Sequence, residues 1–196
     1  MEQTSTLMVD YFDMENLLGI TPSSIMLHGP KKALVDKFIW HLPDTGIICS
    51  YTPKARDVED HFGVFRGVDQ IEAFAQATVV ACSGFSECIK QKCDFDYLKA
   101  NFIPLFVSLG QVNFKSFLLE GETFISMGKI TFYKFRQITC DGRIYKVPKD
   151  LDLDAYFSGY TKEQFLNYEL SDDFILIAEL FDVTGRGMKR EKFISP

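Results

Sequence analysis

The sequence predicts an α+β domain in which one antiparallel sheet covers one long apolar helix. Two strand-like runs, 33–42 and 46–53, precede a helical run, and about four strand-like runs follow it. The 196 residues are enough to bury the core of one domain. No repeat, low-complexity tract or linker divides the chain, so we expect a single domain over 1–196.

Each predicted element carries a local signal. The turn PDTG separates the first two strands, and the helix is expected from Gly67 to Gly84 or a little beyond, roughly 27 Å long at 1.5 Å per residue. The strand-like runs that follow are FIPLFVSL, QVNFKSFLL, ETFISMGKITFYKFRQIT and GRIYKV, with turns at LEGE and CDGR. In the second turn Asp141-Gly142 is a hairpin signal. A last strand is expected over 173–183.

Two segments lie outside this pattern. Residues 1–24 are polar and mixed and form an N-terminal extension, and an acidic, aromatic insert occupies about 148–172. In the insert Thr161 and Gln164 have the spacing of a capping box, which predicts a short helix. The aromatic residues of the insert could cover a ligand tunnel or pack against a partner subunit.

Composition narrows the function classes. A net charge of -6 argues against general nucleic-acid binding, which favours a basic face. No run approaches the ~18 apolar residues of a membrane span, and the first residues lack a signal-peptide pattern. The five cysteines do not have the spacing of a zinc site, and reduced thiols in a cytoplasmic protein are the expected state. The 19 phenylalanines could fill a core or line a pocket for an apolar ligand.

The run IEAFAQATVVAC is apolar on nearly every side, yet it carries a carboxylate. Glu72 and Gln76 lie one helical turn apart and are expected to point into one polar gap. Burial disfavours a charged carboxylate, and a carboxyl group that keeps its proton can act as a general acid. Alternatively, Glu72 lies on a wet stripe of a mostly buried helix, which periodicity alone favours. Small residues at four-residue spacing form a face that a sheet could approach closely: Ala73, Ala77 and Ala81.

A histidine, His61, lies eleven residues before Glu72, across a loop that contains two glycines. A histidine, a glycine at a helix start and a carboxylate suit a base, an anion site and an acid in that order. The amides around Gly67 and Val68 would face a ligand carbonyl at the helix N-terminus. Alternatively, His61 is a surface histidine and the Asp69 side chain occupies those amides.

The segment HF followed by GVDQIEAFAQ resembles the active site of the β-hydroxyacyl-acyl carrier protein dehydratases of the hotdog fold (the FabZ and FabA group). That family has a His-Phe pair, a Pro/Gly-rich loop, Gly-Val, and Glu-Ala-x-Ala-Gln on its central helix. Other segments resemble the family in the same order: LHGPKKALVDK (27–37), LGQVNFKSFLLEGETF (109–124) and IAEL (177–180). The resemblance covers about 27–183 apart from the insert.

The resemblance implies a hotdog fold, in which an antiparallel sheet of about five to six strands wraps a long central helix. It also implies a homodimer or dimer-based oligomer, or a heterodimer with another hotdog subunit, in which two sheets join. The substrate tunnel of the family lies at that interface, where His of one subunit faces Glu of the other.

The resemblance further implies the role of each site residue. His61 would remove the C2 proton of a 3-hydroxyacyl group carried by acyl carrier protein, and Glu72 would protonate the departing 3-hydroxyl. The Gly67 amide would hold the thioester carbonyl, Phe62 would line the acyl tunnel, and Gln76 would orient Glu72. The product is a trans-2-enoyl thioester of fatty-acid, specialised acyl or polyketide synthesis. This chemistry calls for no metal or cofactor.

Two departures from the family pattern keep alternatives open. The loop from His61 to Gly67 is shorter than the family's and has Arg66 in place of a proline, and a lysine pair follows the opening histidine, His28. One alternative is a catalytically weak hotdog subunit that partners an active dehydratase or binds acyl chains. Another is a hotdog thioesterase, in which Glu72 activates water. Basic residues could contact an acidic carrier protein or be solvated: Lys31, Lys32, Lys54, Arg56 and those of the C-terminal tail.

Overall fold

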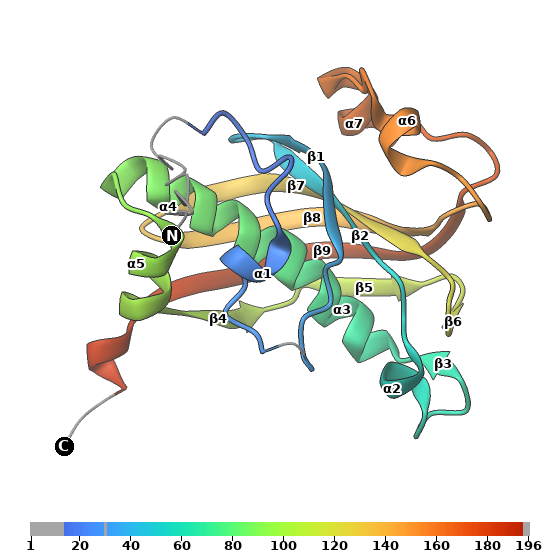
Figure 1. Cartoon of the computed structure of the whole chain (residues 1–196), viewed down its shortest axis with the longest axis horizontal. Helices are drawn as coiled ribbons and strands as arrows, with labels where there is room; N and C mark the ends of the chain where they lie inside the picture. Colours follow the sequence, from blue (N-terminus) through green and yellow to red (C-terminus); the bar gives the residue numbers. More distant parts are fainter. Residues whose placement is uncertain (1–13, 30, 194–196) are drawn as a thin grey trace, which may run out of the picture.

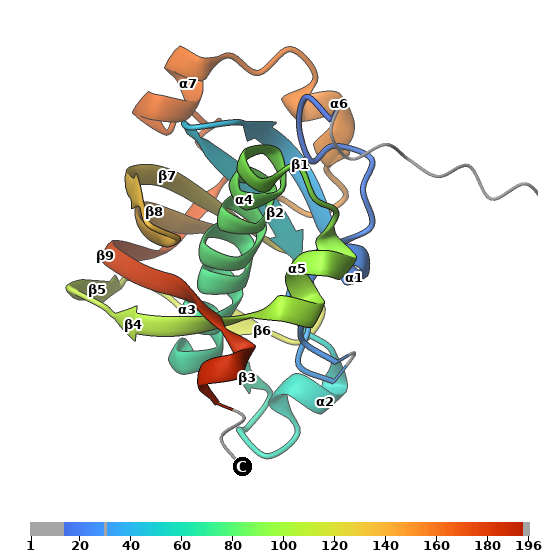
Figure 2. The ribbon, with the colours of Figure 1, turned by 90° about the vertical axis from the view of Figure 1, so that its left-hand side faces the viewer.

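A seven-stranded antiparallel sheet wraps one long helix in the computed structural model of the chain, which describes residues 14–29 and 31–193 (Figure 1). The first thirteen residues of the expected N-terminal extension lie outside the described part. The view along the helix in Figure 2 places it inside the curve of the sheet. The predicted α+β class and wrapped helix are confirmed, and the sheet has one strand more than expected.

The strands of the main sheet follow the order β1-β2-β7-β8-β9-β4, and β5 also pairs with β9. Their bounds are Lys37–Leu42 (β1), Gly46–Tyr51 (β2), Phe124–Lys134 (β7), Gln137–Lys146 (β8), Ile175–Lys189 (β9), Phe102–Ser108 (β4) and Gln111–Phe114 (β5). A separate two-stranded sheet consists of β3 (Val64–Phe65) and β6 (Leu118–Leu119). The strand β4 therefore ends one side of the main sheet.

The long helix begins at Gly67 as predicted and runs past the expected end at Gly84. It has three parts: α3 (Gly67–Ala75), the π-helical segment η2 (Gln76–Cys82) and α4 (Ser83–Gln91). Lys92, in the left-handed conformation, ends it. Short π-helical segments inside α-helices frequently mark functional sites, and this one begins at Gln76, one turn after Glu72.

Glycines on three neighbouring strands let the sheet approach the helix closely. A Cβ atom added at these positions would lie 2.0, 2.4 and 2.1 Å from a helix side chain: Gly128 from Thr78, Gly142 from Phe74, and Gly185 from Val79. The predicted face of alanines is buried in the same core. The closest contacts between the helix and the sheet, however, depend on glycines of the strands. The sequence of the helix alone does not reveal these glycines.

The hairpin predicted at Asp141-Gly142 is wrong. Strand β8 runs through both residues, and the turn between β7 and β8 lies at Phe135 and Arg136, which have φ angles of 53° and 60°. Gly142 is required by its contact with the ring of Phe74, and glycine inside a strand often marks such a close approach. The run predicted as one strand is therefore two.

The insert covers the outer face of the sheet. Its helices, α6 (Leu153–Phe157) and α7 (Lys162–Asn167), are orange in Figure 1. Along β2, Ile47 belongs to the core around the long helix, and the next residue, Ile48, belongs to a second core that includes residues of the insert. Successive side chains of a strand point to opposite faces, so the second core lies on the side of the sheet away from the helix.

Aromatic contacts hold the insert on this outer face. The Trp40 ring stacks on Phe165 at 4.4 Å, and Trp40 Nε1 donates to Tyr160 O at 2.8 Å. The predicted capping box of Thr161 and Gln164 is confirmed at the start of α7. The aromatic residues of the insert therefore pack against their own sheet. No helix in the described ranges is long and apolar enough to cross a membrane.

We predict that Gly142→Ala destabilises the fold by about 1–3 kcal/mol, because the added methyl group overpacks the contact with Phe74 and Met127 O. Urea denaturation followed by circular dichroism measures the change in the free energy of unfolding. Gly29→Ala is the matched control, since a Cβ there has nothing within 4 Å. Equal stability of the two variants would show that the helix and sheet do not need this glycine.

Candidate functional site

The first turn of α3 presents backbone amides without a side-chain cap. Arg66 is the N-cap residue and makes no capping hydrogen bond through its side chain, and the amides of Asp69 and Gln70 donate to Arg66 O. The Asp69 carboxylate is held by the Arg66 guanidinium, with Nε–Oδ2 at 2.6 Å and a second contact at 2.9 Å. The alternative in which Asp69 occupies the amides of Gly67 and Val68 is therefore not seen.

A phenylalanine of β5 lies against the start of this helix. A Cβ atom on Gly67 would lie 2.7 Å from Cζ of Phe114, so only glycine allows this contact without a shift of the ring. Phe114 is about half exposed, and Val68, which follows Gly67 in the sequence, protrudes into solvent. The helix start thus combines backbone amides that no side chain caps with an apolar edge.

The carboxylate of Glu72 is held by a buried amide. Gln76 is 1% exposed, and its Nε2 donates to Glu72 Oε1 at 2.9 Å and to Lys32 O at 2.8 Å. Its Oε1 accepts the Leu34 amide at 2.8 Å. Gln76 therefore orients Glu72 and also connects the segment 32–34, which comes before the first strand, to the helix. The polar gap expected for Glu72 and Gln76 is present.

Of the two alternatives for Glu72, a place on an exposed stripe of the mostly buried helix holds in the single chain, because its side chain is 45% exposed. The reason lies in the sheet order, since Glu72 faces the side on which the sheet ends at β4. It lines two cavities. One, of about 340 Å³, has a charged lining that includes His28, Lys31 and Lys32. The other, of about 90 Å³, runs between the helix and β4 and is mainly apolar.

A second histidine, His28, lies beside this carboxylate. Its Nε2 is 3.4 Å from Glu72 Oε1, and it lines both cavities. The sequence points to His28 only as the histidine of the opening segment, and 44 residues separate it from Glu72. The bonds from Gln76 to Lys32 and Leu34 bring this segment to the helix. No motif in the sequence predicts these bonds.

The predicted base, His61, lies elsewhere in the chain. It is exposed on the loop between α2 (Ala55–Val58) and β3, and its Nδ1 is 3.2 Å from Val64 O. It lines a cavity of about 160 Å³ that does not include Glu72. Its neighbour Phe62 is 97% exposed. One chain does not unite His61 and Glu72, and their expected meeting across two subunits stays a prediction.

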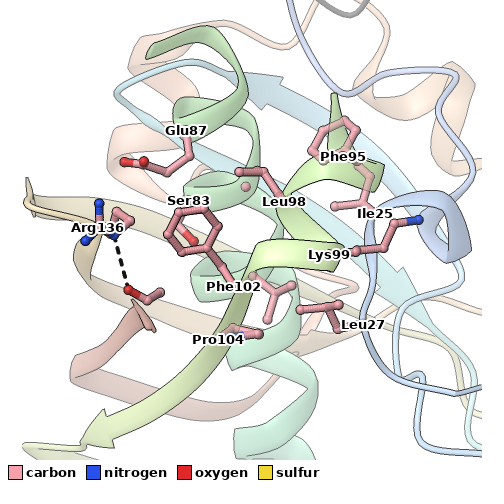
Figure 3. A pocket seen from close by; sticks show the side chains of 13 residues that line it. Ile25, Leu27, Ser83, Glu87, Phe95, Leu98, Lys99, Phe102, Pro104 and Arg136 are labelled. Atoms are coloured by element: carbon pink, nitrogen blue, oxygen red, sulfur yellow. Dashed lines mark hydrogen bonds between the residues drawn. The ribbon is translucent and has the colours of Figure 1, made fainter. Parts of the chain in front are cut away.

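The apolar cavity beside Glu72 continues along the helix. It shares Val80 and Pro104 with a further cavity of about 60 Å³ between α4, β4 and the helix α5 (Phe95–Asn101). Figure 3 shows apolar side chains around most of this space, with Glu87 and Arg136 at one side. The Arg136 guanidinium lies over the Phe102 ring, 5.2 Å from its centroid. The two cavities are neighbours along the helix, and together we call them the elongated groove.

The third histidine, His41, is part of the packed interior and lies outside the candidate site. It is buried, its Nδ1 accepts the Leu17 amide at 3.2 Å, and its ring meets Phe85 edge-on. Burial lowers the pKa of His41 to about 4 because desolvation disfavours the charged ring. Burial also raises the pKa of Tyr133, whose hydroxyl donates to Glu87 beside the elongated groove.

No family model matches this sequence, and no curated protein matches it either. Among solved structures, the chain is similar to the dehydratase heterocomplex ApeI:P from Xenorhabdus doucetiae. The TM-score is 0.60 at 12% identity, over 89% of this chain and 95% of that one. The chain is less similar to the E. coli PaaI protein from the phenylacetic acid degradation operon. The TM-score is 0.44 at 10% identity, over 76% of this chain and 80% of that one. The 1,4-dihydroxy-2-naphthoyl-CoA thioesterase Slr0204 from Synechocystis has a TM-score of 0.45, 12% identity and coverage of 74% and 82%. The chain has the hotdog fold.

We predict that His41 makes the fold sensitive to acid. Its pKa is about 4 in the folded chain, against an ordinary histidine value of 6.5, so the unfolded chain binds the proton more tightly. Stability is therefore lost as the pH falls from about 6.5 towards 4, by about 3 kcal/mol at most. Denaturation of wild type and His41→Gln at pH 7 and pH 4.5 isolates this effect from the carboxylates. An equal loss in both proteins would contradict the assignment.

Proposed function

We propose that this chain acts on acyl thioesters and removes water from 3-hydroxyacyl groups carried by acyl carrier protein. The observation that carries the proposal is the place of Glu72. An oriented carboxyl group lies where a basic cavity meets an apolar groove, five residues after an uncapped helix start. The similarity in fold to a solved dehydratase heterocomplex supports the same reaction class.

The proposed reaction divides among three groups. A base takes the proton from C2, and the amides of Gly67 and Val68 stabilise the negative charge that develops on the thioester carbonyl. Glu72 gives its proton to the 3-hydroxyl, which leaves as water while the double bond forms between C2 and C3. We assign the base to His61 of a second subunit, in keeping with its exposed position in the single chain.

The charged cavity suits the carrier side of the substrate. Lys31, Lys32 and Arg56 line it together with His28, so it presents basic groups beside Glu72. A carrier protein is acidic and delivers its acyl group on a phosphate-bearing arm, and opposite charges steer such encounters. The lining also contains Asp57 and Asp69, which confine the positive charge to part of the cavity.

The elongated groove suits the acyl chain. From Glu72 to Ser83, which lines its far cavity, the helix rises by about 16 Å at 1.5 Å per residue. The walls between are mainly apolar, with Val80 and Pro104 common to both parts. Phe62 and Phe114, at the other end of α3, are exposed for contact near the thioester.

The edge of the sheet suits pairing with a second hotdog subunit. Within the described ranges no strand lies beyond β4, and large apolar side chains are exposed along β4, β5 and the loop that follows: Phe106, Val107, Phe114 and Phe117. Pairing at this edge would cover Glu72 and bring a partner's loop to it. A homodimer and a heterodimer both satisfy this geometry.

A second candidate function follows from the exposure of Glu72. A carboxylate that is 45% exposed and touches the histidine ring of His28 can also activate water for attack on the thioester. The chain would then be a thioesterase, and His61 would be dispensable. The products separate the two functions, since dehydration gives an enoyl thioester and hydrolysis gives a free acid.

We predict that wild-type protein converts a 3-hydroxydecanoyl-carrier thioester to its enoyl form, measured by mass spectrometry. Glu72→Gln and His61→Gln each lower kcat by about 100-fold or more, because each removes a group that moves a proton. Glu163→Gln, in the insert, is the matched control for loss of a surface carboxylate. Release of free acid, with His61→Gln fully active, contradicts dehydration. No turnover by a dimer indicates an acyl-binding subunit instead.

We predict that Ser83→Phe shortens the acyl chain that the groove accepts, because the ring fills the far cavity (Figure 3). The value of kcat/KM falls by roughly tenfold for a tetradecanoyl-length substrate and stays within about twofold for a butyryl-length one. Steady-state kinetics with both substrates measures the difference. An equal fall for the two lengths would place the acyl chain elsewhere.

A further inference from the structure

We propose that His28 is a positioning residue for Glu72: it donates Nε2–H to Glu72 Oε1, so that Oε2 is the oxygen that carries the reacting proton. This inference rests on the proposed role of Glu72 and adds a third residue to the site. It assigns His28 no direct contact with the substrate carbon atoms.

Two side-chain nitrogens lie near one oxygen of Glu72, one in a hydrogen bond and the other in a longer contact. Gln76 Nε2 lies 2.9 Å from Oε1, and His28 Nε2 lies 3.4 Å from the same atom. Among the described residues Oε2 has no polar contact, and Glu72 lines both cavities. The two oxygens are therefore unequal, with one held by the protein and the other left for a ligand. Catalytic hydrogen bonds are often long before substrate binds, and the 3.4 Å contact fits that behaviour.

The other ring nitrogen of His28 fixes the direction of donation. Nδ1 is buried and has no hydrogen-bond partner among the residues that the structure describes. A proton on Nδ1 would be buried without an acceptor, which costs free energy. An unprotonated Nε2 would also face Glu72 Oε1 with no proton between the two atoms, so the proposal places the ring proton on Nε2. In this orientation Nδ1 does not reach the cavities, so the ring is a donor to Glu72 and not a base toward the substrate.

The segment that follows His28 is tied to the same amide that orients Glu72. Gln76 bonds to Lys32 O and to the Leu34 amide, in the segment that follows His28. The acid and the segment with its second donor are thus held by one buried side chain. The other two histidines contact other groups, His61 at Val64 O and His41 at the Leu17 amide.

The first test is the ring nitrogen spectrum of the three histidines, recorded by ¹⁵N NMR on wild type and Glu72→Gln. We expect the Nε2–H tautomer for His28 and a change in its signals in Glu72→Gln, because the carboxyl acceptor is replaced by an amide. The signals of His41 and His61 serve as internal controls and stay unchanged, and His28→Gln assigns the His28 signal. An Nδ1–H tautomer, or unchanged His28 signals in Glu72→Gln, overturns the proposal.

The second test is kinetic and uses variants of matched size. His28→Leu removes the donor and lowers kcat by about tenfold or more with KM within about threefold, because a misplaced acid slows the reaction without weakening binding. His28→Gln keeps an N–H donor and recovers most of kcat, and added imidazole partly restores His28→Ala. Equal kcat in His28→Leu and wild type, or a loss confined to KM, contradicts a positioning role.

The two tests separate the inference from the proposed function. If wild-type protein does not dehydrate the hydroxyacyl thioester, the proposed function fails, and the NMR comparison still decides whether His28 donates to Glu72. If wild type is active but the NMR spectra show no donation from His28 to Glu72, the proposed function stands and His28 only lines the cavity.

Discussion

The structure of the site depends on the buried amide of Gln76. Its Nε2 and Oε1 join the helix carboxylate of Glu72 to the segment 32–34 that comes before the first strand. The bonds are 2.8 to 2.9 Å long and the amide is shielded from water, so losing a partner would leave a buried hydrogen-bonding group incompletely satisfied. The π-helical segment begins at this same residue. Gln76 therefore links three features of the site: the π-helical segment, the position of the segment 32–34, and the orientation of Glu72.

The fold was predictable where the signal was periodic and local. The apolar run after Gly67 and the capping box of Thr161 need no distant contact to be interpreted, and both are confirmed. The turn predicted at Asp141-Gly142 was wrong because glycine in such a dipeptide can have either of two physical roles. Glycine supplies φ freedom in a turn, and it supplies space where a ring such as Phe74 meets a strand. Only the three-dimensional contact distinguishes them.

The site was predictable in its helix and less so in its partners. The pairing of Glu72 with Gln76 follows from their four-residue spacing on a helix. The exposure of Glu72 depends on where the sheet ends, which is a property of strand order. The contact with His28 joins segments far apart in sequence, and no periodicity encodes it. The place of His61 in a working site is a matter of assembly between subunits.

The insert has a consequence for how such molecules can associate. Its helices bury the outer face of β1, β2, β7 and β8 beneath an aromatic layer around Phe157 and Phe165. Two copies therefore cannot stack back to back through bare sheet faces over these strands. Association through the sheet is left to its edges, and β4 is the edge that carries exposed apolar side chains such as Phe106 and Val107. The insert thus limits the surfaces through which the sheet of this chain can contact another copy.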